Sequence, residues 1–162
     1  MIKSIYHGTV LKYANDIVKN GIDLTIGRKR LDFGQGFYTT EDKIQAKEWA
    51  KRKAFGKDTP VVVCFDAIFD NLTVKKFLFQ NNEWKNYVYG NRIFDADLLK
   101  DYDCIIGPMA DGNIKQLIYK MRVGEITKRD FLNEISRGIG EQIAFKTEKS
   151  LFNLTYKGIL EV

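Results

Sequence analysis

The sequence predicts a single α+β domain, and three observations lead to that prediction. Helical patterns and short strand-like runs mix along the chain without the strand–helix–strand rhythm of a doubly wound parallel sheet. Val61–Phe65 is a continuous apolar run of strand length, and Tyr102–Ile106 has the character of a second buried strand. No repeat, low-complexity segment or linker divides the 162 residues. We therefore expect one domain over residues 1–162, large enough to form a real core.

Apolar periodicity and capping residues predict the helices. In Lys12–Asn20 the apolar positions fall on one helical face, and Gly21 is placed to end the helix. Thr40 stands in the N-cap region of the next helix, and Thr127 begins a capping-box-like sequence. The further helices are expected over Asp42–Phe55, Glu83–Arg92, Ile114–Met121 and Thr127–Ser136, with a helical turn at Glu148–Ser150.

The remaining strands are expected to be short. A first strand, Ser4–Tyr6, is expected to stop at the His7-Gly8-Thr9 corner. Ile22–Leu24 is interpreted as extended. The other expected strands are one near the start of Leu72–Phe79, one over Gln142–Phe145, and one or two within Leu151–Val162.

Composition excludes several classes of protein. Hydrophobic residues make up 44% and charged residues 29%, as in ordinary globular domains. No apolar run approaches the roughly 20 residues of a membrane span, and the N-terminus lacks the apolar region of a secretion signal. We therefore expect a cytoplasmic protein without a membrane partner. Cys64 and Cys104 stand in strand-like settings and suggest buried thiols; with one histidine, His7, no metal site is expected.

Two basic clusters account for much of the net charge of +5. One is Arg28-Lys29-Arg30, and the other lies on the second expected helix, at Lys47 and Lys51–Lys53. Such charge can attract nucleic acid or another polyanion, but it more often forms a solvated face. No nucleic-acid-binding motif accompanies these residues, so the clusters do not by themselves predict that function.

A glycine-rich stretch, Asp32–Thr40, is the least ordinary part of the chain. Gly34 and Gly36 allow positive φ values or the close approach of a ligand, and the following Phe37–Thr40 suits a strand. Tyr38, near the start of that strand, could offer its ring to a flat ligand. The alternative is a turn into a core strand whose aromatic residues only pack. The stretch is neither a dinucleotide-binding fingerprint nor a P-loop.

Taken together, several motifs resemble the catalytic domain of poly(ADP-ribose) polymerases. Their order, His-Gly, then Gly-x-Tyr, then a late glutamate, is similar to that of the diphtheria-toxin-like ADP-ribosyltransferases. The closest resemblance is to a bacterial family of unknown function in that superfamily, and it covers nearly the whole chain. The segments that carry it are Tyr6–Thr9, Ile17–Asp23, Asp32–Tyr38, Ile44–Ala50, Asn91-Arg92, Tyr102–Asp111 and Glu141–Thr147.

The resemblance implies a split β-sandwich of two small antiparallel sheets flanked by helices, with NAD in the cleft between them. His7 would bind the adenosine ribose of NAD, and the backbone of Gly8 would pair with the nicotinamide amide. Thr9 would steady that end of the site. Tyr38, in the Gly36-Phe37-Tyr38 motif, would stack on the nicotinamide ring. The implied co-substrate is NAD, without a metal.

Two neighbouring residues are candidates for the position near the bond between nicotinamide and ribose that would be cleaved. Glu141 matches the glutamate of the polymerases, whereas Gln142 matches the characteristic residue of the bacterial family. Side chains alternate along a strand, so only one of the two can face the cleft. Gln142 is slightly favoured, and both are retained as catalytic candidates together with His7 and Tyr38.

Four further polar residues have less definite roles. Arg92, beside Asn91, could bind a phosphate of NAD or could form a salt bridge at a helix end. Asp111 follows an expected strand, where functional loops often gather. Arg28 and Arg30 precede the glycine-rich stretch and could touch substrate, although exposed basic residues usually do not.

The function implied by the resemblance is mono-ADP-ribosyl transfer. NAD would lose nicotinamide, and ADP-ribose would pass to an unknown macromolecular acceptor, either protein or nucleic acid. Such a protein would be a bacterial toxin or a regulatory modifier, and a toxin would have an antitoxin partner. The alternatives are an NAD glycohydrolase on the same fold and a non-catalytic member that binds NAD or a protein.

Overall fold

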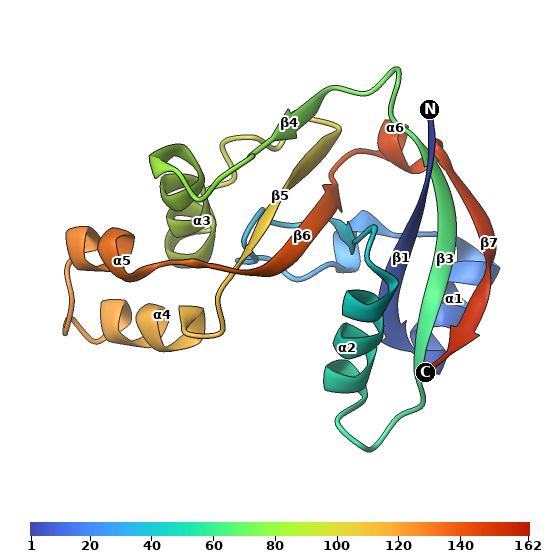
Figure 1. The fold of residues 1–162 in the computed structure, drawn as a ribbon, viewed down its shortest axis with the longest axis horizontal. Helices are drawn as coiled ribbons and strands as arrows, with labels where there is room; N and C mark the ends of the chain where they lie inside the picture. Colours follow the sequence, from blue (N-terminus) through green and yellow to red (C-terminus); the bar gives the residue numbers. More distant parts are fainter.

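Two small sheets form the framework of the protein (Figure 1), a computed structural model of residues 1–162. The first sheet has the order β1–β3–β7 and is antiparallel throughout. The second has the order β2–β6–β5–β4, and only its β4–β5 pair is parallel. The predicted α+β fold with two small, mostly antiparallel sheets is therefore confirmed. The strands are β1 (Ile2–Val10), β2 (Phe37–Thr39), β3 (Pro60–Ile68), β4 (Val74–Lys76), β5 (Cys104–Ala110), β6 (Arg137–Phe145) and β7 (Leu154–Glu161).

Helices lie around both sheets. In Figure 1, α2 lies along β1 of the first sheet, whereas α3, α4 and α5 gather at the far end of the second sheet. The helices are α1 (Leu11–Asn20), α2 (Lys43–Ala54), α3 (Asn82–Phe94), α4 (Ile114–Arg122), α5 (Lys128–Glu134) and α6 (Glu148–Leu151). The predicted capping box of Thr127 is confirmed, with Thr127 and Asp130 satisfying each other's backbone N–H groups.

Several local predictions were wrong in whole or in part. The strand expected over Gln142–Phe145 already begins at Arg137, and the helix expected over Thr127–Ser136 ends at Glu134. The first strand does not stop at His7, because β1 continues in register with β3 up to Val10. The N-cap of α2 is Asp42, whose Oδ1 accepts hydrogen bonds from the N–H groups of Ile44 (2.8 Å) and Gln45 (3.3 Å), and not Thr40. The extended piece expected over Ile22–Leu24 ends one residue early: Asp23 is extended, but it caps a short 3₁₀ helix, Leu24–Ile26, that takes in Leu24.

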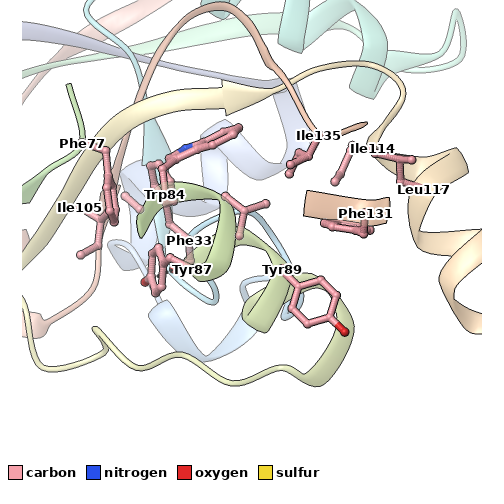
Figure 2. Close-up of a cluster of buried hydrophobic side chains, with 12 residues drawn as sticks. Phe33, Phe77, Trp84, Tyr87, Tyr89, Ile105, Ile114, Leu117, Phe131 and Ile135 are labelled. Carbon is pink, nitrogen blue, oxygen red and sulfur yellow. Dashed lines mark hydrogen bonds between the residues drawn. The ribbon is translucent and has the colours of Figure 1, made fainter. Parts of the chain in front are cut away.

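Each face of the second sheet packs against its own cluster of buried hydrophobic side chains. One face packs against α3, α4 and α5, and Figure 2 shows the aromatic side chains of that cluster. There the rings of Phe33, Phe77 and Tyr87 lie together, with centroids 5.6–6.0 Å apart. The other face packs against the first sheet through a cluster that includes Phe37, Phe145, Ile5 and Val63. The second sheet is thus buried on both sides.

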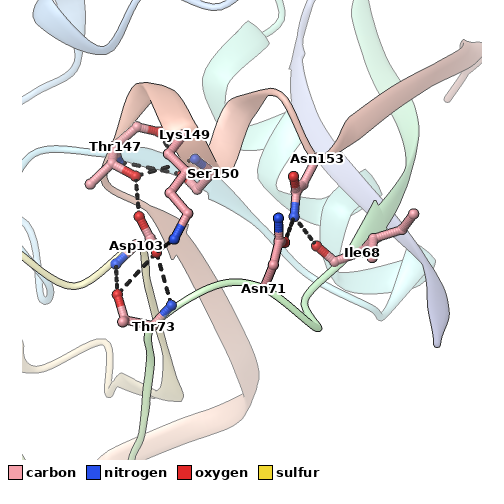
Figure 3. A network of polar contacts seen from close by, with 8 residues as sticks. All are labelled: Ile68, Asn71, Thr73, Asp103, Thr147, Lys149, Ser150 and Asn153. Atoms are coloured by element: carbon pink, nitrogen blue, oxygen red, sulfur yellow. Dashed lines mark hydrogen bonds and ion pairs between the residues drawn. The ribbon is translucent and has the colours of Figure 1, made fainter.

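Asp103, just before β5, links the residue before β4 to the beginning of α6 (Figure 3). The residue is 5% exposed, and its carboxylate accepts hydrogen bonds from the Thr73 N–H (2.8 Å), the Thr147 hydroxyl (2.6 Å) and the Lys149 ammonium (3.1 Å). Burial by itself would raise the pKa of Asp103, but the hydrogen bonds from Thr147, Thr73 and Lys149 outweigh it and hold that pKa well below its ordinary range. The charged carboxylate is therefore a stabilising element.

We predict that Asp103→Asn lowers the free energy of unfolding by about 3 kcal/mol at pH 7, because buried donors lose their charged acceptor. The unfolded carboxyl group, with an ordinary pKa of about 3.9, takes up its proton before the folded one. The contribution of Asp103 is therefore complete above about pH 4 and is lost as the pH falls further.

Urea unfolding between pH 2 and pH 7 measures this dependence. Asp101→Asn, at an exposed neighbour, is the matched control and should behave as wild type. An equally steep loss of stability in acid for wild type and Asp103→Asn would contradict the prediction.

Candidate active site

His7, in the middle of β1, has a defined tautomer. Its Nδ1 lies 2.6 Å from the Tyr38 carbonyl oxygen, which can only accept, so Nδ1 carries the proton and donates it. Its ring packs on Phe37 with centroids 4.4 Å apart. Burial lowers the pKa of His7 to about 4; the hydrogen bond to Tyr38 opposes this shift, and the nearby charge of Lys53 adds to it. At neutral pH the imidazole is uncharged, and Nε2 is a hydrogen-bond acceptor.

The backbone of Gly8 belongs to the edge of β1 that points away from β3. Tyr6 exchanges both backbone hydrogen bonds with Thr40, at 2.8 and 3.0 Å, so Tyr6 faces this outer edge. Hydrogen-bonding direction alternates along an antiparallel strand, which gives Gly8 the same orientation as Tyr6. No backbone hydrogen bond from outside the first sheet reaches Gly8. A Cβ at position 8 would lie 2.0 Å from the Ala46 carbonyl oxygen, so only glycine allows α2 to lie this close.

A hollow of about 310 Å³ lies where the two sheets meet. Its lining combines three carboxylate residues with a threonine and two apolar side chains. These are Thr40, Glu41, Asp42, Ile106, Glu141 and Ile143. Thr40 connects this lining to β1 through its backbone bridge to Tyr6, and Gln45 on α2 donates a hydrogen bond of 3.0 Å to the Glu141 carbonyl oxygen. Neither His7 nor Gly8 is among the residues that line the hollow.

Glu141 and Gln142 point to opposite faces of β6, as alternation requires. Glu141 lines the hollow with an exposed side chain. Gln142, the residue slightly favoured from the sequence, is 5% exposed and donates from Nε2 to Asp32 Oδ2 at 3.0 Å. The structure thus places Glu141 at the hollow and turns Gln142 into the interior on the other side of the sheet.

Asp32 organises the interior on the Gln142 face. Its Oδ1 receives Nε and Nη2 of Arg92, at 2.8 and 2.7 Å. Its Oδ2 receives the Ala110 N–H at 2.8 Å as well as the Gln142 amide. Asn91 adds a hydrogen bond of 3.2 Å to the backbone carbonyl of Asp32. Arg92 and Asn91 therefore hold the glycine-rich stretch against α3, and neither lines the hollow.

Tyr38 also secures the glycine-rich stretch. Its hydroxyl donates to the Gly34 carbonyl oxygen at 2.6 Å and accepts from the Phe33 N–H at 3.1 Å. Burial, with a contribution from Asp32, raises the pKa of Tyr38 well above its usual value. Its ring packs in the cluster beside α3, on the face away from the hollow. What Tyr38 offers the site is its backbone carbonyl, which positions His7.

The other predicted residues are dispersed around this centre. A Cβ on Gly36 would lie 2.8 Å from the Phe145 carbonyl oxygen, so glycine is required for β2 to lie beside β6. Thr9 is fully buried, and its hydroxyl has no hydrogen-bond partner. Asp111 accepts a hydrogen bond from the Ser136 hydroxyl at 3.2 Å, away from the hollow. The two arginines of the Arg28-Lys29-Arg30 cluster have different neighbours. Arg30 donates a hydrogen bond to the Ile93 carbonyl oxygen at 2.6 Å, whereas Arg28 lies near Lys53.

Trp49 is a residue whose position the sequence reasoning did not use. It is half-buried on α2, one turn beyond Gln45 and next to Ala50, which packs on Gly8. Residues four apart share one side of a helix, so Trp49 lies on the same side of α2 as Gln45. The sequence feature that could have drawn attention to Trp49 is its place in the Ile44–Ala50 segment, which carries part of the resemblance.

A family model described as "Protein of unknown function (DUF3990)" matches residues 3–156. The chain belongs to this family. Neither the curated proteins nor the solved structures provide a match. In this DUF3990 protein no group of three or more His, Cys, Asp and Glu side chains is placed to hold a metal ion. None of its helices combines the length and the apolar character needed to cross a membrane.

We predict that His7 does not titrate between pH 5 and pH 8, because its pKa is lowered to about 4. Its ring ¹⁵N shifts should show a protonated Nδ1 and a bare Nε2 over this range. As the only histidine of the chain it gives a single, assignable set of NMR signals. The urea-unfolded chain is the control and should titrate near pH 6.5. A midpoint above pH 6 in the folded protein would rule out the neutral imidazole.

We predict that Gln142→Glu lowers the free energy of unfolding by about 2 kcal/mol or more, because a second carboxylate would lie beside the buried Asp32. The matched change Glu141→Gln, at an exposed side chain of the same strand, should stay within about 0.5 kcal/mol of wild type. Denaturant titration at pH 7 measures both. Equal stability of the two variants would show that Gln142 is not held against Asp32.

Proposed function

We propose that this protein is an NAD-dependent mono-ADP-ribosyltransferase. The observation that carries the proposal is the presence of three suitable groups on the two sides of the Tyr6–Thr40 bridge that joins the sheets. These are the neutral His7 with a free Nε2, the outward backbone edge of Gly8, and the Glu141 carboxylate in the hollow. The resemblance of the His-Gly, Gly-x-Tyr and glutamate motifs to those of ADP-ribosyltransferases supports the same reading.

The nicotinamide half of NAD suits the Gly8 edge. A carboxamide carries one donor and one acceptor side by side, and the N–H and C=O of an outward-facing strand residue complement them. Trp49, on the same side of α2 as Gln45, offers a large aromatic surface for the pyridinium ring, and a cation favours the face of an indole. In this proposal Trp49 takes the stacking role first considered for Tyr38, whose half-buried side chain packs on the other face of the second sheet.

His7 suits a ribose hydroxyl. Because Nδ1 is committed to the Tyr38 carbonyl, Nε2 can accept a hydrogen bond from a hydroxyl group without any change of protonation. The lowered pKa keeps this acceptor available throughout the neutral range. The role is one of binding and orientation, not proton transfer.

Glu141 supplies the charge that bond cleavage requires. As the bond between the ribose C1′ and the nicotinamide nitrogen breaks, its electron pair leaves with nicotinamide and positive charge develops on the ribose. A carboxylate hydrogen-bonded to the 2′-hydroxyl stabilises that charge. The acceptor then forms a bond to C1′ and releases its proton to Glu141 or to water.

NAD glycohydrolysis is the second candidate. Glu141 is exposed, so water reaches the position from which an acceptor would attack. The two reactions share the first step and differ in the group that captures C1′. NAD labelled in its adenylate half separates them, because transfer leaves the label on a macromolecule and hydrolysis leaves free ADP-ribose.

The decisive experiment follows nicotinamide release by wild type, Glu141→Gln and Gln142→Ala, with a cell lysate as the acceptor source. We expect Glu141→Gln to lower kcat by about 100-fold or more while its stability is unchanged, as for the loss of a group acting on the transition state. Gln142→Ala serves as the control for the opposite face and should mainly lower stability. No release by wild type, with or without lysate, would refute both enzymatic candidates.

A further inference from the structure

A basic surface surrounds the start of α1 and the end of α2, and the proposed function does not use it. Lys12 and Lys53 both place their ammonium groups 4.9 Å from the centroid of the Tyr13 ring. The turn after α2 lies against the same place, because the Leu11 N–H donates to the Thr59 carbonyl oxygen at 2.9 Å. We call the following residues the α1–α2 basic surface: Lys12, Arg28, Arg52, Lys53 and Lys57.

The charges of this surface are largely without partners in the protein, although Arg52 contributes, after Lys51, to lowering the pKa of Glu48. None of its five residues takes part in an ion pair, although eight ion pairs occur elsewhere in the chain. Asp58 is the one acidic residue of the turn at 55–59, and it too is unpaired. Burial and the nearby charge of Arg28 lower the pKa of Lys53, which agrees with cations held close together. The surface is thus ready for an anionic partner.

An exposed aromatic residue with a strained backbone ends α2, two residues after Lys53. Phe55, the C-cap of α2, is 83% exposed and has a left-handed backbone, with φ 50° and ψ 30°. That conformation disfavours a bulky side chain and usually selects glycine or asparagine. An exposed ring in a strained conformation contributes no core packing, so folding alone gives no reason for it.

We propose that the α1–α2 basic surface binds single-stranded nucleic acid. Phosphates would contact the lysine and arginine side chains, and a base would stack on Phe55. This combination of unpaired cations with a free aromatic face is the usual basis of sequence-tolerant single-strand binding. The inference stands independently of NAD cleavage. Since Lys53 also lies close enough to His7 to influence its pKa, a bound strand would lie near the candidate active site.

The test is fluorescence anisotropy with a labelled twelve-nucleotide oligouridylate, titrated with full-length protein at several salt concentrations. Wild type should bind saturably, with an affinity that falls as salt rises. Arg52→Ala combined with Lys53→Ala should reduce the salt slope by about 1.4, which is about 0.7 for each lost phosphate contact. Phe55→Gly should weaken binding about tenfold through loss of stacking. The same variant should raise the melting temperature, because glycine adopts the left-handed backbone without strain.

Matched controls remove similar groups elsewhere. Lys115→Ala with Arg129→Ala takes two exposed cations from α4 and α5, at the other end of the molecule (Figure 1). Phe152→Ala removes a ring of similar exposure, 86%, at the end of α6. Both should bind as wild type. Absence of saturable binding, equal losses in the control variants, or equally tight binding of a twelve-residue oligoglutamate would each overturn the proposal. NAD cleavage is measured separately, so either proposal can fail alone.

Discussion

The buried carboxylate of Asp32 is the interaction on which the arrangement of the site depends. It joins the glycine-rich stretch to α3 through Arg92, to β5 through the Ala110 N–H and to β6 through Gln142. A buried carboxylate is stable only when its lone pairs are satisfied, and here four donors satisfy them. Because the stretch leads directly into β2, Asp32 also sets the position of the Tyr38 carbonyl that orients His7.

Close backbone approach is the second constraint. Gly8 lets α2 lie directly on β1, and Gly36 lets the start of β2 lie against β6. The Tyr6–Thr40 bridge then joins the two sheets at their shared edge. Beyond that bridge the pairing ends, which leaves the Gly8 edge of β1 without a neighbouring strand. The hollow is lined by Thr40, at the bridge, and by Glu41 and Asp42, which follow it. The candidate site is thus a consequence of how far the sheets are joined.

The two faces of the second sheet pack against different parts of the protein. One face, with Tyr38 and Gln142, is anchored in the interior with the aromatic cluster of Figure 2. The other, with Phe37, Glu141 and Ile143, faces the first sheet and the hollow. This separation lets Gln142 serve stability while its neighbour Glu141 stays exposed, and it makes the two residues independent targets for mutation.

The sequence by itself determined the α+β class, the main helices and the central strand β3, because apolar periodicity and capping are local properties. Its motifs also singled out His7, Gly8 and Glu141. The sequence could not show to which face of the sheet each side chain points, because the register of β6 against β2 and β5 depends on contacts between residues distant in the chain. For that reason Gln142 was favoured over Glu141, Arg92 was considered for phosphate, and Trp49 was not used. Only the tertiary structure joined Asp32 to Gln142, which lies 110 residues further along the chain.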